Sequence, residues 1–200
     1  MREILFATGN EAKVKRFRDK LLERNVRLLT LKDIDMELDV LEDGSNAIQN
    51  ALIKARAYHK VTGMITLAMD DTLFLEQVPS DMQPGMYVRR VQGRRLSDDE
   101  MISYYSNLAK KYGQNGRITA RWIYGMALIN QGKEFTYTWS KDDFYLVDKP
   151  SSIVNPGYPL NSISVNKKLN KYFTDLTEED KVLCEEDESD VVQFIVDHLS

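Results

Sequence analysis

A recurring order of elements limits the folds open to this 200-residue chain. In it, a short apolar segment ends at a polar turn and leads into an amphipathic helix. Residues 3–7 are predicted to form a buried strand that stops at Thr8-Gly9-Asn10. Val14, Phe17 and Leu21 then recur at helical spacing, while basic residues fill the opposite face. Strands that alternate with amphipathic helices in this way predict an α/β fold.

The alternation continues along the chain. An acidic turn at 42–45 precedes a predicted helix with Ser45 or Asn46 as its N-cap. The apolar face of that helix is expected to be Ile48, Leu52, Ala55 and His59. Strands are expected over 27–31, 65–69, 118–129, 135–139 and 144–147, with a break at 130–132. Three further helices are expected: one that opens on the capping box 97–100, an acidic helix from Thr177, and a final helix through Leu199. No linker is long enough to separate domains, so residues 1–200 are predicted to form a single α/β domain.

Composition and charge argue against several kinds of partner. The net charge is −4, from 27 basic and 31 acidic residues, which does not suit a nucleic-acid polymer. The single cysteine and two histidines lack the spacing of a zinc site. The apolar run 4–7 is far too short for a signal peptide or a membrane span. We therefore expect a cytoplasmic protein that binds no membrane.

The first candidate binding site is Thr8-Gly9-Asn10-Glu11-Ala12-Lys13, where a strand passes into a helix. Backbone N–H groups at the start of a helix can bind an anion, and a glycine lets the backbone approach a phosphate closely. Thr8 and Asn10 can add hydrogen bonds, and Lys13 adds a positive charge. The same residues are also compatible with an ordinary N-cap followed by a solvated basic face.

Carboxylates and a lysine form the second group of candidates. Glu42 lies near a helix start, where a carboxylate can hold Mg²⁺, and Lys54 on that helix can neutralise phosphate oxygens. Asp70 and Asp71 follow an apolar strand, at the kind of sheet edge where α/β proteins bind ligands. An aspartate there could ligate Mg²⁺ and orient or deprotonate an attacking water. The alternatives are solvated surface charges at 42 and 54 and a simple turn at 70–71.

Three stretches of sequence occur in an order that is more specific than any one of them. ILFATGNEAKVKRF contains Thr-Gly-Asn-x-x-Lys, EDGSNAIQNALIKAR contains Asn-Ala-x-x-Lys-Ala-Arg after an acidic-glycine turn, and LAMDDT places two aspartates after a strand. In this order they resemble the inosine-triphosphatase-like family of nucleoside triphosphate pyrophosphatases. QPGMYVRR is similar to the Pro-Gly-x-x-x-x-Arg loop of that family, and ARWIYGMALI to its central strand. The resemblance is good over roughly the first half of the chain and thin beyond Ile129.

The resemblance implies a fold, a reaction and a set of residues. The implied fold is an elongated mixed β-sheet flanked by helices, with two lobes and a cleft between them. The implied reaction is Mg²⁺-dependent hydrolysis of a nucleoside triphosphate between its α and β phosphates, in a homodimer. The implied site consists of Thr8, Gly9, Asn10, Lys13, Lys54, Thr72 and Tyr158 for phosphate and nucleotide binding, Glu42 and Asp71 for the metal, and Asp71 as general base supported by Asp70.

The part of the family pattern that covers and reads the base is changed in this chain. Where the family has Gly-Phe-Gly-Tyr-Asp-Pro, residues 155–160 keep Gly157-Tyr158 and lack the aspartate. Where the family has Ser-His-Arg, this chain has Glu185-Glu186-Asp187. Ionised carboxylates accept hydrogen bonds and cannot donate them to the oxo group of a purine. An altered base preference is therefore predicted. The Ser-Gly that usually follows the two aspartates is Thr72-Leu73 here, and Thr72 keeps a hydroxyl.

These departures leave other hypotheses open. One is a catalytically inactive relative that keeps the fold and binds nucleotide or a partner. Glu42 and Asp71 discriminate between this hypothesis and the enzyme, because a binding module has no need of a metal-dependent hydrolytic site. A weaker hypothesis is a structural protein whose acidic tail contacts a basic partner, which leaves the first-half motifs unexplained. The run 185–187 could also be a solvated helix start, and Tyr158 an ordinary loop tyrosine.

Overall fold

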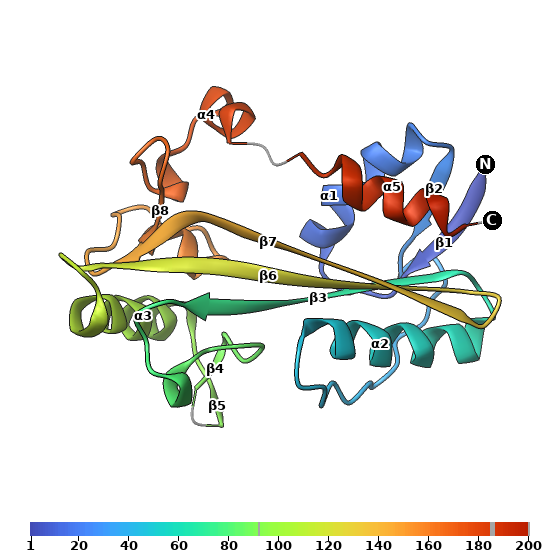
Figure 1. Ribbon diagram of the computed structural model, residues 1–200, viewed down its shortest axis with the longest axis horizontal. Coiled ribbons are helices and arrows are strands. Elements are labelled where there is room, and N and C mark those ends of the chain that lie inside the picture. The colour runs from blue at the N-terminus through green and yellow to red at the C-terminus, as the bar shows by residue number, and fades with distance from the viewer. Residues whose placement is uncertain (92, 185–186, 200) are drawn as a thin grey trace. The chain divides into compact units, whose positions relative to one another are not determined.

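The computed structural model describes residues 1–91, 93–184 and 187–199, and its elements are strands and helices in alternation (Figure 1). The helices are α1 (Glu11–Leu22), α2 (Ala47–Thr62), α3 (Asp98–Tyr112), α4 (Glu178–Leu183) and α5 (Ser189–Asp197). The strands are β1 (Arg2–Phe6), β2 (Val26–Leu29), β3 (Thr66–Leu75), β4 (Arg90–Val91), β5 (Arg94–Arg95), β6 (Arg117–Asn130), β7 (Lys133–Val147) and β8 (Ser164–Asn166). The predicted α/β class is confirmed.

The main sheet has six strands in the order β2-β1-β3-β6-β7-β8, and β4 pairs with β5 separately. β1 is parallel to both β2 and β3, whereas β7 is antiparallel to β8, so the sheet is mixed as predicted. The turn between β6 and β7 consists of Gln131 and Gly132, both with positive φ, which is the geometry of a type I′ hairpin. β7 is one continuous strand, where two shorter strands were predicted. Its polar middle is tolerated because alternate side chains are exposed.

The packing of the chain divides into two compact units. The first consists of Met1–Asp71, Tyr124–Trp139 and Asp187–Ser200, and the second of Thr72–Ile123 and Ser140–Glu186. The first three divisions along the chain fall within β3, β6 and β7. The single domain over 1–200 and the cleft stay predictions. Among the described residues, no helix is both long enough and apolar enough to cross a membrane.

In the first unit, α1 and α5 lie on one side of the strands and α2 lies on the other (Figure 1). The buried face of α1 is Val14, Phe17 and Leu21, as its spacing predicted. Phe17 packs edge-on against Phe6 of β1, with ring centroids 6.4 Å apart. This contact fixes the first helix on the strand that precedes it, and with it the turn at 8–10.

The buried face of α2 differs from the predicted one. Ala55 is buried as expected, but Ile48, Leu52 and His59 are only half-buried. The residues that face the core are Ala47, Asn50, Ala51, Ala55 and Tyr58. Small side chains let the helix lie close to the sheet, so the alanines pack with Leu5, Ala68 and Ala127. The buried face of this helix is therefore shifted by one to two residues from the row of larger apolar side chains.

The prediction that β3 ends before the two aspartates is wrong. The strand runs through Asp70 and Asp71 to Leu75. Leu73 and Leu75 lie in the core of the second unit, and Leu73 bonds through its backbone with Gly85. Burial of these two leucines favours continuation of the strand, which places the aspartates within β3.

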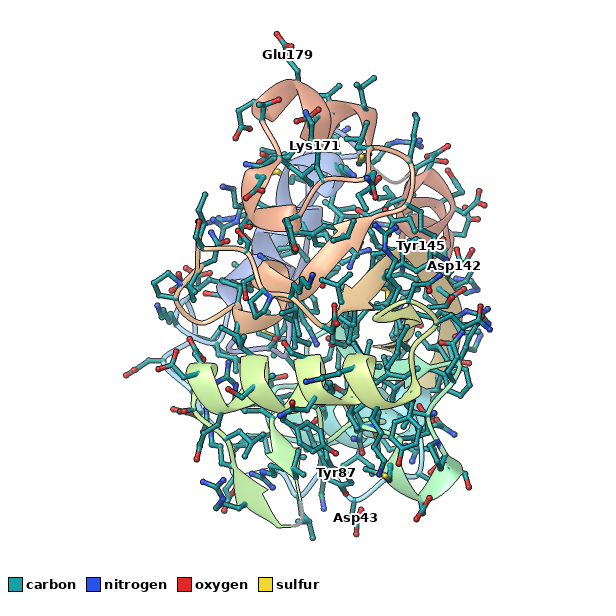
Figure 2. The ribbon with its side chains drawn as sticks, turned by 90° about the vertical axis from the view of Figure 1, so that its left-hand side faces the viewer. Asp43, Tyr87, Asp142, Tyr145, Lys171 and Glu179 are labelled. Atoms are coloured by element: carbon teal, nitrogen blue, oxygen red, sulfur yellow. The ribbon has the colours of Figure 1, made fainter. Side chains whose placement is uncertain are left out.

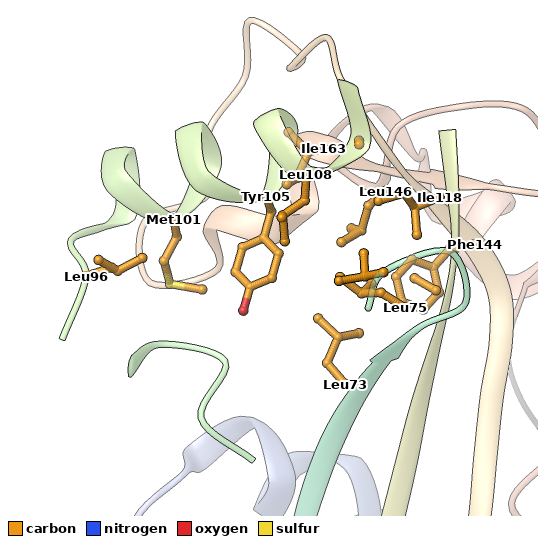
Figure 3. Packing of buried hydrophobic residues seen from close by; sticks show 13 residues of the cluster. Leu73, Leu75, Leu96, Met101, Tyr105, Leu108, Ile118, Phe144, Leu146 and Ile163 are labelled. Atoms are coloured by element: carbon orange, nitrogen blue, oxygen red, sulfur yellow. The ribbon is translucent and has the colours of Figure 1, made fainter. Parts of the chain in front are cut away.

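The second unit has its own hydrophobic core. α3 directs Met101, Tyr105 and Leu108 toward Leu73 of β3 and Phe144 of β7 (Figure 3). The Tyr105 hydroxyl donates to the Val88 carbonyl over 2.8 Å, and burial raises the pKa of that tyrosine above its usual range. α3 begins at the predicted capping box, formed by Ser97 and Glu100.

The short helix α4 also begins with a capping box, which Thr177 forms with Asp180. Lys171 binds the Asp180 carboxylate at 2.8 Å and lowers the pKa of that aspartate. Glu179 of the same helix points outward, away from Lys171 (Figure 2). The acidic helix predicted from Thr177 is therefore present, and its start is held by its own side chains.

Candidate active site

The start of α1 is organised by the side chain of Asn10. Its Oδ1 atom accepts hydrogen bonds from the backbone N–H groups of Ala12 and Lys13, at 2.9 and 3.3 Å. The Thr8 hydroxyl oxygen accepts from the Asn10 N–H at 3.1 Å. Several of the N–H groups expected to face a ligand are thus already bonded to Thr8 and Asn10. The residues that cap α1 are therefore the same residues that were predicted to bind phosphate.

Lys13 lies on the face of α1 that is turned toward β3. Its ammonium group forms an ion pair with the Asp71 carboxylate and lies 3.5 Å from the Met69 carbonyl oxygen. Only 16% of the Lys13 side chain and 29% of the Asp71 side chain are exposed. The structure therefore brings together a predicted phosphate ligand and the predicted general base, which are 58 positions apart in the sequence.

Lys54 and Glu42 form a second ion pair of the same kind. The Lys54 ammonium group lies 2.7 Å from the Glu42 carboxylate, and the lysine side chain is 16% exposed. Asp43, the next acidic residue of the turn, is exposed and projects outward (Figure 2). Of the two acidic residues in the turn, Glu42 is the one held against α2.

Asn50 is the site residue that sequence reasoning missed. It is 3% exposed. Its Oδ1 atom accepts from the Gly44 N–H at 2.8 Å, and its Nδ2 group donates to the Asp70 carboxylate at 2.9 Å. A side-chain carbon on Gly44 would lie 2.7 Å from Asn50 Oδ1, so only glycine allows this close approach. The signal was the first residue of Asn-Ala-x-x-Lys-Ala-Arg, which lies one helical turn before Lys54.

The two aspartates of β3 face different helices. Successive residues of a strand point to opposite faces of a sheet. Accordingly, Asp70 contacts Asn50 of α2, whereas Asp71 contacts Lys13 of α1. Among the described residues, the network therefore runs from Glu42 and Lys54, through Gly44 and Asn50, to the paired aspartates and Lys13.

The chemistry of these residues suits Mg²⁺. Glu42 and Asp71 offer the hard carboxylate oxygens that this cation prefers. Within the described part of the chain, no three or more His, Cys, Asp or Glu side chains are grouped closely enough to form a complete metal site. Mg²⁺ is commonly held by one or two carboxylates together with substrate phosphates, so this arrangement fits the ion.

Two predicted nucleotide ligands belong to the second unit. The Thr72 hydroxyl donates to the Ile123 carbonyl at 3.3 Å, and Tyr158 is 51% exposed. The loop that carries Tyr158 is held at Gly157, whose N–H donates to Asp98 at 2.8 Å. Arg89 donates to that carboxylate at 2.7 Å. The roles of Thr72 and Tyr158 toward a nucleotide stay predictions.

The acidic run near the end of the chain is described only in part, because Glu185 and Glu186 lie outside the described residues. Asp187 accepts from the Ser189 N–H at 2.9 Å at the start of α5. The Ser189 side chain and backbone both lower the pKa of this aspartate. Its carboxylate therefore serves the helix start, which is the alternative that the sequence left open for this run.

Comparisons with known proteins agree with the fold and the motifs. A model of the Ham1 family matches residues 4–184. The chain is 27% identical over 181 residues to a dITP/XTP pyrophosphatase of Bacillus subtilis (strain 168), covering 90% of this chain and 89% of the relative. A dITP/XTP pyrophosphatase of Leptospira interrogans is 26% identical over 180 residues, which cover 90% of this chain and 88% of the relative.

Solved structures share the fold at lower identity. A HAM1 protein from Coxiella burnetii superposes with a TM-score of 0.74 at 20% identity, covering 98% of both chains. The Staphylococcus aureus Ham1 protein gives a TM-score of 0.69 at 23% identity, covering 98% of this chain and 97% of the other. The family model spans nearly the whole chain, and the motifs at 8–13, 42–56 and 70–71 lie inside it. This chain therefore belongs to the Ham1 family, as a divergent, inosine-triphosphatase-like member.

Proposed function

We propose that this chain hydrolyses a nucleoside triphosphate between its α and β phosphates in a Mg²⁺-dependent reaction, and releases a nucleoside monophosphate and pyrophosphate. The coarser statement, that the chain is a nucleoside triphosphate pyrophosphatase and hence a hydrolase, follows from the family and from its relatives. Assembly as a homodimer, which the motif resemblance implies, is part of the proposal.

One observation carries the proposal. Two lysines assigned to phosphates, Lys13 and Lys54, each form an ion pair with a carboxylate assigned to the metal. A magnesium–triphosphate complex presents negative oxygens and a cation side by side. Each lysine can therefore exchange its carboxylate for a phosphate oxygen, and each carboxylate can exchange its lysine for the cation. Each of these four charged groups then faces an opposite charge in both states.

Residues of the first unit then have separate roles in binding and in proton transfer. Lys13, Lys54 and the Asn10 Nδ2 group hold phosphate oxygens, so that the bond to be broken is fixed in place. Bound Mg²⁺ supplies charge neutralisation on the phosphate oxygens. Asp71, released from Lys13, accepts a proton from the attacking water as the P–O bond to pyrophosphate breaks. Asp70 supports Asp71 from the opposite face of β3.

The proposal includes a base preference that differs from that of the relatives named for dITP and XTP. It rests on the loss of Ser-His-Arg and of the aspartate after Gly-Tyr. Donors that suit an oxo group are absent from these sequence positions, and carboxylates suit an exocyclic amino group instead. The preferred substrate is thus expected to differ from inosine and xanthine nucleotides.

The test is pyrophosphate release from a panel of standard and modified nucleoside triphosphates, with Mg²⁺ and with EDTA. Asp71→Asn is expected to lower the rate by about 10²- to 10⁴-fold, the usual contribution of a general base. Asp43→Asn is the matched control, because Asp43 is an exposed acidic residue outside the network. A silent panel, with nucleotide still raising the thermal unfolding midpoint, would show that the chain is the inactive relative.

A further inference from the structure

We infer that Asn50 is a positioning residue that sets the separation of the two metal-binding carboxylates, an inference that rests on the proposed function. Asn50 contacts the chain beside each assigned ligand: Gly44, two residues after Glu42, and Asp70, directly before Asp71. A single buried side chain therefore ties the turn that carries one carboxylate to the strand that carries the other.

The chemistry of the two contacts allows only one orientation of the Asn50 side chain. The Gly44 N–H can only donate and an ionised Asp70 can only accept, so the amide must direct Oδ1 to the turn and Nδ2 to the strand. Both distances, 2.8 and 2.9 Å, are those of well-formed hydrogen bonds. No hydrophobic residue of similar size can make both bonds.

The surroundings of Asn50 leave little room for adjustment. Its side chain is almost fully buried, and the Gly44 backbone lies against it too closely for any other residue at 44. Lys54, one turn further along α2, holds Glu42 itself at 2.7 Å. Asn50 and Lys54 thus both hold the turn on α2, and the Asn50 side chain also extends to β3 through Asp70.

The first experiment measures binding of Mn²⁺, in the presence of inorganic pyrophosphate, to the parent, to Asn50→Ala and to Gln49→Ala. Pyrophosphate carries no base, so the result does not depend on the preferred nucleotide. Gln49 is the matched control, because its Oε1 atom accepts from the N–H and the hydroxyl of Ser45 in the same turn, from the exposed side. All variants are measured where circular dichroism shows them folded.

Asn50→Ala is expected to weaken Mn²⁺ binding by about 10- to 100-fold, the usual effect of losing a partner that orients metal ligands. Gln49→Ala is expected to stay close to the parent. A merely structural role would lower the unfolding temperature of Asn50→Ala but leave the Mn²⁺ affinity of the folded protein unchanged. That second result would overturn the inference.

A pair of substitutions tests the same point if Asn50→Ala does not fold. Asn50→Asp alone places two carboxylates in contact and is expected to weaken Mn²⁺ binding. Combining it with Asp70→Asn restores a donor and an acceptor at the same two positions, and the acceptor for Gly44 is kept. Recovery of Mn²⁺ binding in the double variant supports positioning. A folded double variant that still fails to bind Mn²⁺ contradicts it.

Failure of the inference is distinguishable from failure of the proposed function. If the parent releases pyrophosphate and binds Mn²⁺ while Asn50→Ala matches Gln49→Ala, only the role of Asn50 is wrong. If the parent itself neither binds Mn²⁺ with pyrophosphate nor releases pyrophosphate from any nucleotide, the proposed function is wrong.

Discussion

At the scale of single residues, the site is a set of charges paired with one another. Lys13 and Asp71 form one pair, and Lys54 and Glu42 form the other. The sequence predicted all four residues as members of a site, from a helix start (Lys13), an acidic turn and the helix after it (Glu42 and Lys54), and a pair of aspartates after an apolar strand (Asp71). Their pairing was not predictable, since the partners are far apart in the chain.

Lys13→Ala is expected to raise the KM for nucleoside triphosphate, because it removes a charged hydrogen bond to phosphate. Such a bond contributes about 1.5–3 kcal/mol, which corresponds to roughly 10- to 150-fold. Steady-state pyrophosphate release measures the effect, with Lys15→Ala as control, because Lys15 is an exposed lysine on another face of α1. Unchanged kinetic constants would remove Lys13 from the site.

Lys54→Met is expected to have opposite effects on two binding measurements. Without phosphate, Mn²⁺ no longer competes with an ammonium group for Glu42 and should bind up to about fivefold more tightly, since partly exposed ion pairs contribute up to about 1 kcal/mol. With pyrophosphate present, binding should weaken, because a phosphate contact is lost. Isothermal titration measures both, and Lys60→Met on the exposed side of α2 is the control. Two changes of the same sign would refute the exchange.

At the scale of elements, caps and turns are the features that local sequence predicted best. The capping box at the start of α3, the N-cap of α1 and the turn between β6 and β7 all lie where they were expected. These features form between residues two to four positions apart, so a short stretch of sequence contains both partners. The extent of β3 and the buried face of α2 were wrong, because distant packing decides them.

Asp98 links two elements of the second unit, and its contribution should depend on pH. The Arg89 side chain, and then the Gly157 N–H, lower the pKa of Asp98 in the folded chain. The stability that Asp98 contributes is thus present above the ordinary aspartate pKa of about 3.9 and is lost as the pH falls through the lower folded value.

The measurement is the difference in thermal unfolding midpoint between the parent and Asp98→Ala at pH 7 and near pH 3. The difference is expected to shrink at the lower pH. Asp99→Ala is the control, since Asp99 lies in the same first turn of α3 and is exposed. An equal difference in unfolding midpoint at both pH values would show that the Asp98 charge does not contribute to the stability provided by its contacts with Arg89 and Gly157.

At the scale of the whole molecule, ion pairs join α5, near the end of the chain, to α1, near its beginning. Glu188, at the start of α5, is 5% exposed and pairs with Arg16 and Lys20 of α1. The Arg16 guanidinium also lies 4.5 Å from the ring centre of Tyr124. Glu188 thus binds basic residues of α1, whose basic face was solvated in one of the two alternatives that the sequence left open.

Glu188→Ala is expected to lower the free energy of unfolding by about 2 kcal/mol, because it leaves two cations without their buried carboxylate. Chemical denaturation measures the change, and Asp190→Ala, an exposed acidic residue in the first turn of α5, should have little effect. Equal losses in the two variants would contradict a specific role for the buried ion pairs.

Local sequence was enough to predict the α/β class and the helix starts, because each depends on neighbours within a few positions. The family resemblance supplied the residues proposed for phosphate and metal binding. The folded chain settles which of these residues meet. It continued β3 through Asp70 and Asp71 because Leu73 and Leu75 are buried beyond them. It also placed the buried Asn50 between Gly44 and Asp70. These outcomes depend on contacts between segments far apart in the chain, where burial and hydrogen-bond satisfaction outweigh local preference.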